Sequence, residues 1–159
     1  MTTGGGRTIG LDLGSVRCGV AIDDELGELA FPRAALPAGD RAALVRALVA
    51  FAREEGAVRF VLGLPLELSG REGRAAEKSR TFARSLVEAS QLAVELWDER
   101  LSTVAANRAL REAGHDSRKS RTRVDSAAAA MLLQSWLEAH RAQLARAEVA
   151  ARASREPPR

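Results

Sequence analysis

The sequence of 159 residues lacks several features on which whole classes of protein depend. It contains one cysteine, so no internal disulfide can form, and this fits a reducing cytoplasm. It has no run of about 18 apolar residues, and residues 1–7 lack the apolar core of a secretory signal. Tyrosine is absent, which excludes every mechanism that uses a tyrosyl nucleophile. We therefore expect a soluble, cytoplasmic protein with no membrane partner.

Lysine is also scarce, because Lys78 and Lys119 are the only two and the remaining basic residues are arginine. A genome that favours arginine codons explains that choice, but it does not explain how charge is distributed. Residues 1–99 contain 12 basic and 15 acidic residues, whereas residues 100–159 contain 12 basic and 6 acidic residues. A basic C-terminal part favours a polyanionic partner such as nucleic acid.

The apolar pattern predicts one α/β domain. Short apolar runs separated by Gly and Asp turns are typical of an antiparallel β-meander, and later apolar runs alternate with segments of helical period. The expected strands are 8–13, 18–22, 58–64 and 92–97, with a further run that starts at 29–31 and is closed by Pro32 and Pro37. The expected helices are 40–55, 75–89, 104–113 and 124–139, the last extending to about residue 153. Helical crossovers make the later strands parallel to their neighbours. We expect a mixed five-stranded sheet flanked by helices over residues 1–142, with 143–159 an Ala/Arg-rich extension whose end is disordered.

Asp12 is the first candidate functional residue, because it lies inside an apolar strand where a carboxylate is costly to bury without compensation. Gly10 and Gly14 flank it and leave room for a ligand or a backbone segment to approach. The alternative is an edge-strand aspartate whose side chain lies in solvent.

Two further acidic positions lie where α/β sheets place their ligands. Asp98 and Glu99 directly follow a strand, and strand ends border ligand crevices in open α/β sheets. Because side chains alternate across a strand, only one of the two can face such a site, and Asp98 could instead cap the turn that follows. Asp125 lies near the start of the last helix on its apolar stripe, where the alternative is an acid favoured by the helix dipole.

Together, Asp12, Glu99 and Asp125 predict a metal site. Clustered carboxylates repel one another unless cations neutralise them, and hard oxygen ligands select Mg²⁺ or Mn²⁺. Two such ions can activate a water and stabilise the leaving oxygen of a phosphodiester.

Four segments in order carry a resemblance to a known family: IGLDLGSVRCGVAI, VLGLPLELSGREG, DERLST and VDSAAAAMLLQSWL. The chain resembles the YqgF/RuvX family over about residues 7–140. That family is similar to the Holliday-junction resolvase RuvC and shares the RNase H-like fold. The resemblance implies that Asp12, Glu99 and Asp125 are the catalytic metal ligands. Ser102 stands where the family often has Thr, and Glu67 stands where Asn is frequent, so Glu67 is a reserve acidic candidate.

Several basic residues could bind a phosphate backbone. Arg17 lies in the turn beside Asp12, and Arg100 adjoins Glu99, although an exposed turn residue and a structural ion pair are equally good interpretations. Residues 115–123 contain no apolar side chain and are expected to form a flexible basic loop. The four cations of that segment, which we call the basic cluster, are Arg118, Lys119, Arg121 and Arg123. They could clamp nucleic acid through phosphate contacts that do not depend on sequence, or form a solvated loop.

The remaining conspicuous side chains favour structural roles. Cys18, Trp97 and Trp136 lie within apolar runs and are expected in the core. His115 and His140 lack the spacing of metal ligands and are expected at the surface.

The sequence therefore predicts a nuclease with two bound Mg²⁺ or Mn²⁺ ions. The resemblance implies processing of the 5′ end of pre-16S rRNA, with Holliday-junction or other branched-DNA cleavage as the rival. A non-catalytic nucleic-acid-binding factor and an actin-like ATPase are the alternatives from other classes. Symmetric cleavage of a four-way junction would also require a homodimer.

Overall fold

A single five-stranded mixed sheet forms the centre of the protein. The structure is a computed structural model that describes residues 5–102, 118–155 and 157, and for 118–125 the backbone alone. The strands are β1 Arg7–Leu13, β2 Arg17–Asp23, β3 Ala30–Pro37, β4 Ala57–Leu64 and β5 Ala93–Asp98. They are arranged in the order β3-β2-β1-β4-β5. The first three are antiparallel neighbours, whereas β4 runs parallel to β1 and β5 parallel to β4, as the sequence predicted.

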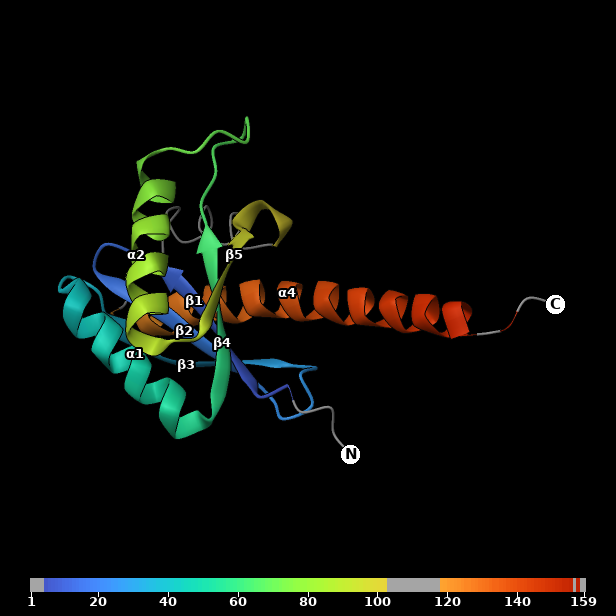
Figure 1. The fold of residues 1–159 in the computed structure, drawn as a ribbon. Helices are drawn as coiled ribbons and strands as arrows, with labels where there is room; N and C mark the ends of the chain where they lie inside the picture. Colours follow the sequence, from blue (N-terminus) through green and yellow to red (C-terminus); the bar gives the residue numbers. More distant parts are fainter. Residues whose placement is uncertain (1–4, 103–117, 156, 158–159) are drawn as a thin grey trace.

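Helices cover both faces of this sheet (Figure 1). The helices are α1 Arg41–Glu55, α2 Arg74–Ser90, the 3₁₀ turn η1 Glu99–Leu101 and α4 Arg118–Arg155. The α1 helix begins after Asp40, whose carboxylate accepts a hydrogen bond from the Ala43 amide, and it ends at Gly56 in the left-handed region. The helix expected over residues 104–113 lies outside the described residues.

Side-chain alternation divides the core between the two faces. Ile9 and Leu11 of β1 belong to the cluster beneath α1 and α2, together with Phe60 and Leu62 of β4. The intervening β1 positions Gly10 and Asp12 therefore face α4, and this second cluster is built mainly from α4 residues with Val61 and Ala21. The candidate acid of β1 thus lies on the α4 side of the sheet.

The third strand runs through one of the two prolines that were expected to close it. The expected run began at residues 29–31 and was closed by Pro32 and Pro37; β3 does end at Pro37, but it includes Pro32, which pairs with Ala21 of β2. A proline cannot donate to a central ladder, but β3 is an edge strand, where one side of the backbone needs no partner. Position in the sheet therefore overrides the proline signal.

The last helix begins earlier than predicted. Residues 118–123 were expected in a basic loop, and this expectation is wrong, because their backbone already forms the first turns of α4. Arginine and lysine have high helix propensity, so a segment without apolar residues can extend a helix that is anchored further along. The expected extension towards residue 153 is confirmed, since α4 continues to Arg155. Within the described ranges, no helix is long and apolar enough to cross a membrane.

Candidate active site

The carboxyl ends of three parallel strands meet at one edge of the sheet. Asp12 is the penultimate residue of β1 and is 5% exposed. The register pairs Leu11 with Leu62 of β4, so the next step along both strands brings Asp12 beside Gly63. Neighbouring strands lie about 4.8 Å apart, and Asp12 therefore lies within one strand spacing of Gly63.

Glu99 reaches the same place from the other side of β4. Gly63 pairs with Trp97 of β5, and Glu99 follows that strand at the start of η1. A methyl group built on Gly63 would lie 2.8 Å from Glu99 Oε1, so the carboxylate occupies the space that a side chain at Gly63 would take. The same methyl group would lie 2.8 Å from Leu132 Cδ1, which places this space on the α4 side. The two buried carboxylates, Asp12 and Glu99, therefore flank Gly63 on one face.

The α4 helix packs closely against this face. A methyl group on Gly10 would lie 2.7 Å from Leu133 Cβ and 3.1 Å from the Ala129 carbonyl oxygen. Small residues allow the approach, since Ala128 and Ala129 are almost fully buried. Asp125 lies in α4 one turn before Ala129, about 6 Å along the helix axis. The fold thus brings the backbone of the third predicted acid to the layer that holds the other two.

A metal site of three ligands cannot be completed from the described side chains. Among them, no group of three His, Cys, Asp or Glu residues could hold an ion, and the Asp125 side chain is not among them. Asp12 and Glu99 supply only carboxylate oxygens, the donors that Mg²⁺ and Mn²⁺ prefer. Ser126, next to Asp125, is 1% exposed, and its hydroxyl has no hydrogen-bond partner in the described part of the chain. The donor set of carboxylate and hydroxyl oxygens fits the chemistry of a hydrated Mg²⁺ or Mn²⁺ ion.

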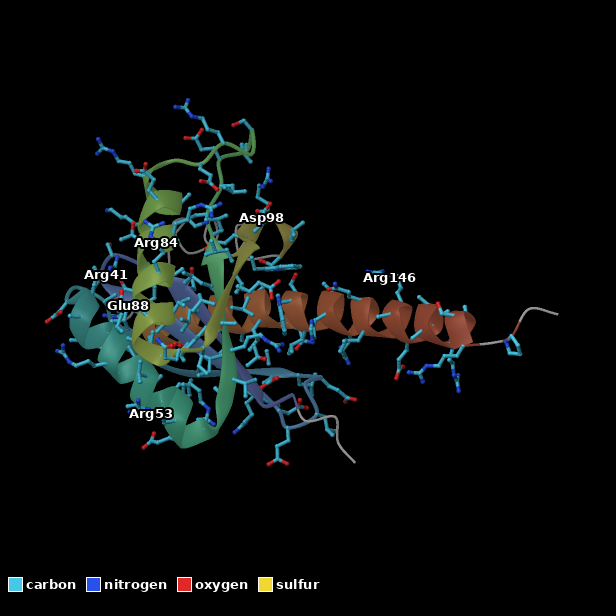
Figure 2. The ribbon with its side chains drawn as sticks, viewed as in Figure 1. Arg41, Arg53, Arg84, Glu88, Asp98 and Arg146 are labelled. Carbon is cyan, nitrogen blue, oxygen red and sulfur yellow. The ribbon has the colours of Figure 1, made fainter. Side chains whose placement is uncertain are left out.

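Asp98 has a structural role, which was the alternative left open by the sequence. Its carboxylate accepts a hydrogen bond from the Arg100 amide at 2.9 Å and caps η1. It also receives the Arg100 guanidinium, with Nη2 at 2.7 Å from Oδ2 (Figure 2 marks Asp98 at this edge). These hydrogen bonds from Arg100 lower the pKa of the Asp98 carboxyl. Arg100 is thereby fixed, and its guanidinium lies beside Gly70 of the 65–73 loop.

Two other predicted residues, Arg17 and Glu67, have described positions outside the pair of carboxylates. Arg17 begins β2 next to the turn that follows β1, with its carbonyl accepting a hydrogen bond from Gly14. Glu67 is exposed in the 65–73 loop, and its Oε1 lies near Gly73 at the start of α2. The side chains of the basic cluster lie outside the described residues.

Gly63 is the residue of this site that sequence reasoning missed. A signal was present, because a glycine inside the buried strand VRFVLGL weakens the strand unless something approaches closely. The sequence alone could not say that the approaching group is Glu99. The expected core positions of Cys18 and Trp136 are confirmed, whereas His140 is half-buried and stacks on Trp136 with ring centroids 4.4 Å apart.

The mixed sheet, with helices on both faces, places this protein in the RNase H-like class of α/β folds. RuvC from T. thermophilus, solved with a Holliday junction substrate, superposes with a TM-score of 0.52 at 12% identity, over 85% of this chain and 95% of that one. This likeness concerns the fold.

Sequence comparison gives the family within that class. The RuvX family model, described as Holliday junction resolvase, matches residues 6–139. A Myxococcus xanthus protein named "Putative pre-16S rRNA nuclease" is 47% identical over 85% of this chain and 89% of its own length. A relative of the same name from Anaeromyxobacter is 43% identical over 86% of this chain and 99% of its own. The chain belongs to the RuvX family.

Proposed function

We propose that this protein is a metal-dependent nuclease that hydrolyses phosphodiester bonds at the 5′ end of pre-16S rRNA in the cytoplasm. The observation that carries the proposal is the pair of buried carboxylates, Asp12 and Glu99, flanking Gly63 beneath α4. Two buried acids at one place are unfavourable unless a cation compensates them. The names of the relatives support the choice of pre-16S rRNA as substrate.

The proposed ligands of two Mg²⁺ or Mn²⁺ ions are Asp12, Glu99 and Asp125. When bound, such ions make a water nucleophilic at neutral pH and stabilise the leaving oxygen of a phosphodiester. The chain positions these groups: Asp12 lies on a central strand, and the Glu99 carboxylate lies against Gly63, where Leu132 also approaches. Side chains held on rigid elements need little reorganisation when substrate binds.

Substrate binding is assigned to cations around this edge. Arg17 lies beside the β1 end, and the basic cluster lies in the first turns of α4, before Asp125. Phosphate contacts from these residues would orient the backbone without reading its sequence. Arg100 is already engaged by Asp98, so its role is to hold the turn that carries Glu99 and to offer its remaining nitrogen to a phosphate.

A cleavage panel tests the proposal. Purified protein is incubated with pre-16S rRNA, single-stranded nucleic acid and a four-way DNA junction, each with Mg²⁺ and with Mn²⁺. We expect rRNA cleavage by the wild type and its loss in Asp12→Asn, Glu99→Gln and Asp125→Asn. Asp23→Asn is the matched control, because Asp23 is a buried acid at the opposite end of β2, away from this edge. Full activity in all three site variants would refute the assignment.

Cleavage of branched DNA is the second candidate function, favoured by the description of the matching family model. The same carboxylates would serve both substrates, so the panel separates the two by substrate. Preference for the junction, with two chains per complex, would favour this candidate. Salt-sensitive binding without cleavage of any substrate would instead indicate a nucleic-acid-binding factor.

A further inference from the structure

The last part of α4 projects from the domain as a helix with no core of its own. Every residue from 141 to 155 is exposed, whereas Trp136 and Leu137 are buried. We call residues 141–155 the C-terminal arm, and Figure 1 shows it extending beyond the sheet. Its one side-chain hydrogen bond among the described residues is local, from Ser154 Oγ to the Ala150 carbonyl. The arm begins after residue 139, where the family match ends.

Composition explains why the arm is helical without packing. Alanine and arginine, two of the best helix formers, make up most of its 15 residues. The arm also continues a helix that is anchored between residues 126 and 137, so the unfavourable nucleation step is already complete.

The arm is strongly basic. It carries Arg141, Arg146, Arg152 and Arg155 against the single acid Glu148. None of these arginines makes an ion pair within the described part of the chain, although four other arginines do. Figure 2 shows Arg146 on the projecting part of the helix. At about 100° per residue, Arg141, Arg152 and Arg155 lie within about 60° of one another around the helix, on the side that also carries Glu148, whereas Arg146 lies on the other side. The three arginines form a basic face complementary to a polyanion.

The apolar residues of the arm do not favour a second helix as its partner. Leu144 is 54% exposed and Val149 is 69% exposed. They lie five residues apart, about 140° around the helix, so they cannot share the continuous apolar stripe that helix pairing requires.

We propose that the C-terminal arm binds the phosphate backbone of the substrate at a distance from the cleavage site. This inference rests on the proposed nuclease function and adds a second contact region to it. At 1.5 Å per residue, the arm spans about 24 to 45 Å from Asp125 along one continuous helix. A duplex flank would have to extend roughly 7 base pairs from the scissile bond to reach it, at about 3.4 Å per step. The arm therefore contributes affinity for long substrates and leaves the chemistry unchanged.

The test compares two variants that lose the same charge. The arm variant combines Arg141→Gln, Arg152→Gln and Arg155→Gln, which removes the charge of the basic face and keeps a residue of similar helix propensity. The control variant combines Arg46→Gln, Arg53→Gln and Arg84→Gln, three exposed arginines on α1 and α2. Each is titrated without divalent metal, by fluorescence anisotropy, against an RNA with a 20-base-pair flank and against one with a 4-base-pair flank. Circular dichroism checks that α4 keeps its helicity.

We expect the arm variant to bind the long RNA roughly 10- to 100-fold more weakly at 0.1 M salt, with a shallower salt dependence. Its affinity for the short RNA and its cleavage rate on that RNA should match the wild type, and the control variant should retain most of the affinity for long RNA. Equal binding of the long RNA by the arm variant and the wild type overturns the proposal, as does an equal loss in both variants. A wild type that sediments as two chains while the arm variant sediments as one also overturns it, because the arm then joins two copies.

The experiment distinguishes failure of the nuclease function from failure of RNA binding by the C-terminal arm. If the wild type cleaves the short RNA and the arm variant binds the long RNA normally, the arm assignment alone fails. If the wild type cleaves neither RNA, the nuclease assignment fails, and the anisotropy comparison still decides whether the arm binds phosphates.

Discussion

Replacing Gly63 by alanine tests directly whether the space above β4 is reserved for Glu99. The added methyl group would lie 2.8 Å from Glu99 Oε1 and 2.8 Å from Leu132 Cδ1, whereas ordinary contact begins near 3.4 Å. Each neighbour would therefore have to retreat by about 0.6 Å. Leu132 is fully buried and Glu99 is 7% exposed, so the added methyl group would enter a packed region.

The magnitudes follow from these contacts. Adding a methyl group to a packed core costs about 1–3 kcal/mol, which a domain with about 5–15 kcal/mol of stability survives. A functional group must stay within about 0.5 Å of its productive position, and a 1 Å displacement costs about 100-fold in rate. We therefore expect the Gly63→Ala protein to fold with a free energy of unfolding lower by about 1–3 kcal/mol. Its cleavage rate should be at least about tenfold lower than that of the wild type.

The assay pairs urea denaturation with cleavage rates measured across a titration of Mg²⁺. Gly39→Ala is the matched control, because a methyl group there has nothing within 4 Å, and both measurements should equal the wild type. A Gly63→Ala protein with wild-type stability and wild-type cleavage would show that the carboxylate of Glu99 is not confined as described.

Three other substitutions have defined outcomes. Gly10→Ala should lower the free energy of unfolding by about 1–3 kcal/mol in urea and reduce cleavage, because Leu133 Cβ and the Ala129 carbonyl cannot move aside without α4; unchanged values would contradict the close packing. Burial raises the pKa of the Asp23 carboxyl, so wild-type stability should fall as pH rises from about 4 through that raised pKa. The urea midpoint of the Asp23→Asn variant should not decline over this pH range. If the variant and the wild type show the same pH profile, Asp23 is not the cause of the decline. Neutralising the basic cluster should weaken substrate binding and flatten its salt dependence while metal affinity, measured by calorimetry, stays unchanged.

The apolar pattern of the sequence predicted those strands whose position depends on their own residues. Alternation and β-branched runs placed β1, β2, β4 and β5 to within one residue at each end, because the apolar pattern of a strand is local to it. The pattern failed where the decisive partner is distant. The extension of β3 past Pro32 depends on its place at the sheet edge, and the early start of α4 depends on anchoring by residues further along.

The residues of the candidate site also differ in how far the sequence could predict them. Asp12 could be recognised from sequence because a carboxylate in an apolar strand is anomalous by itself. The choice between Asp98 and Glu99 could not be made from alternation alone, because the chain turns into η1 directly after Asp98. The structure distinguishes them, since Asp98 is occupied by Arg100 whereas Glu99 is buried over Gly63.

The α4 helix is continuous in geometry but unequal in stability along its length. Leu132 and Leu133 are fully buried, so their amides should exchange with solvent only when the whole domain opens. Beyond His140 no burial opposes local fraying, so protection against hydrogen exchange should decline towards zero by Arg155. One helix thus carries a rigid segment that closes the core and a segment that can melt and reform on its own, which lets the outer part adapt in shape without disturbing the layer that holds the buried acids.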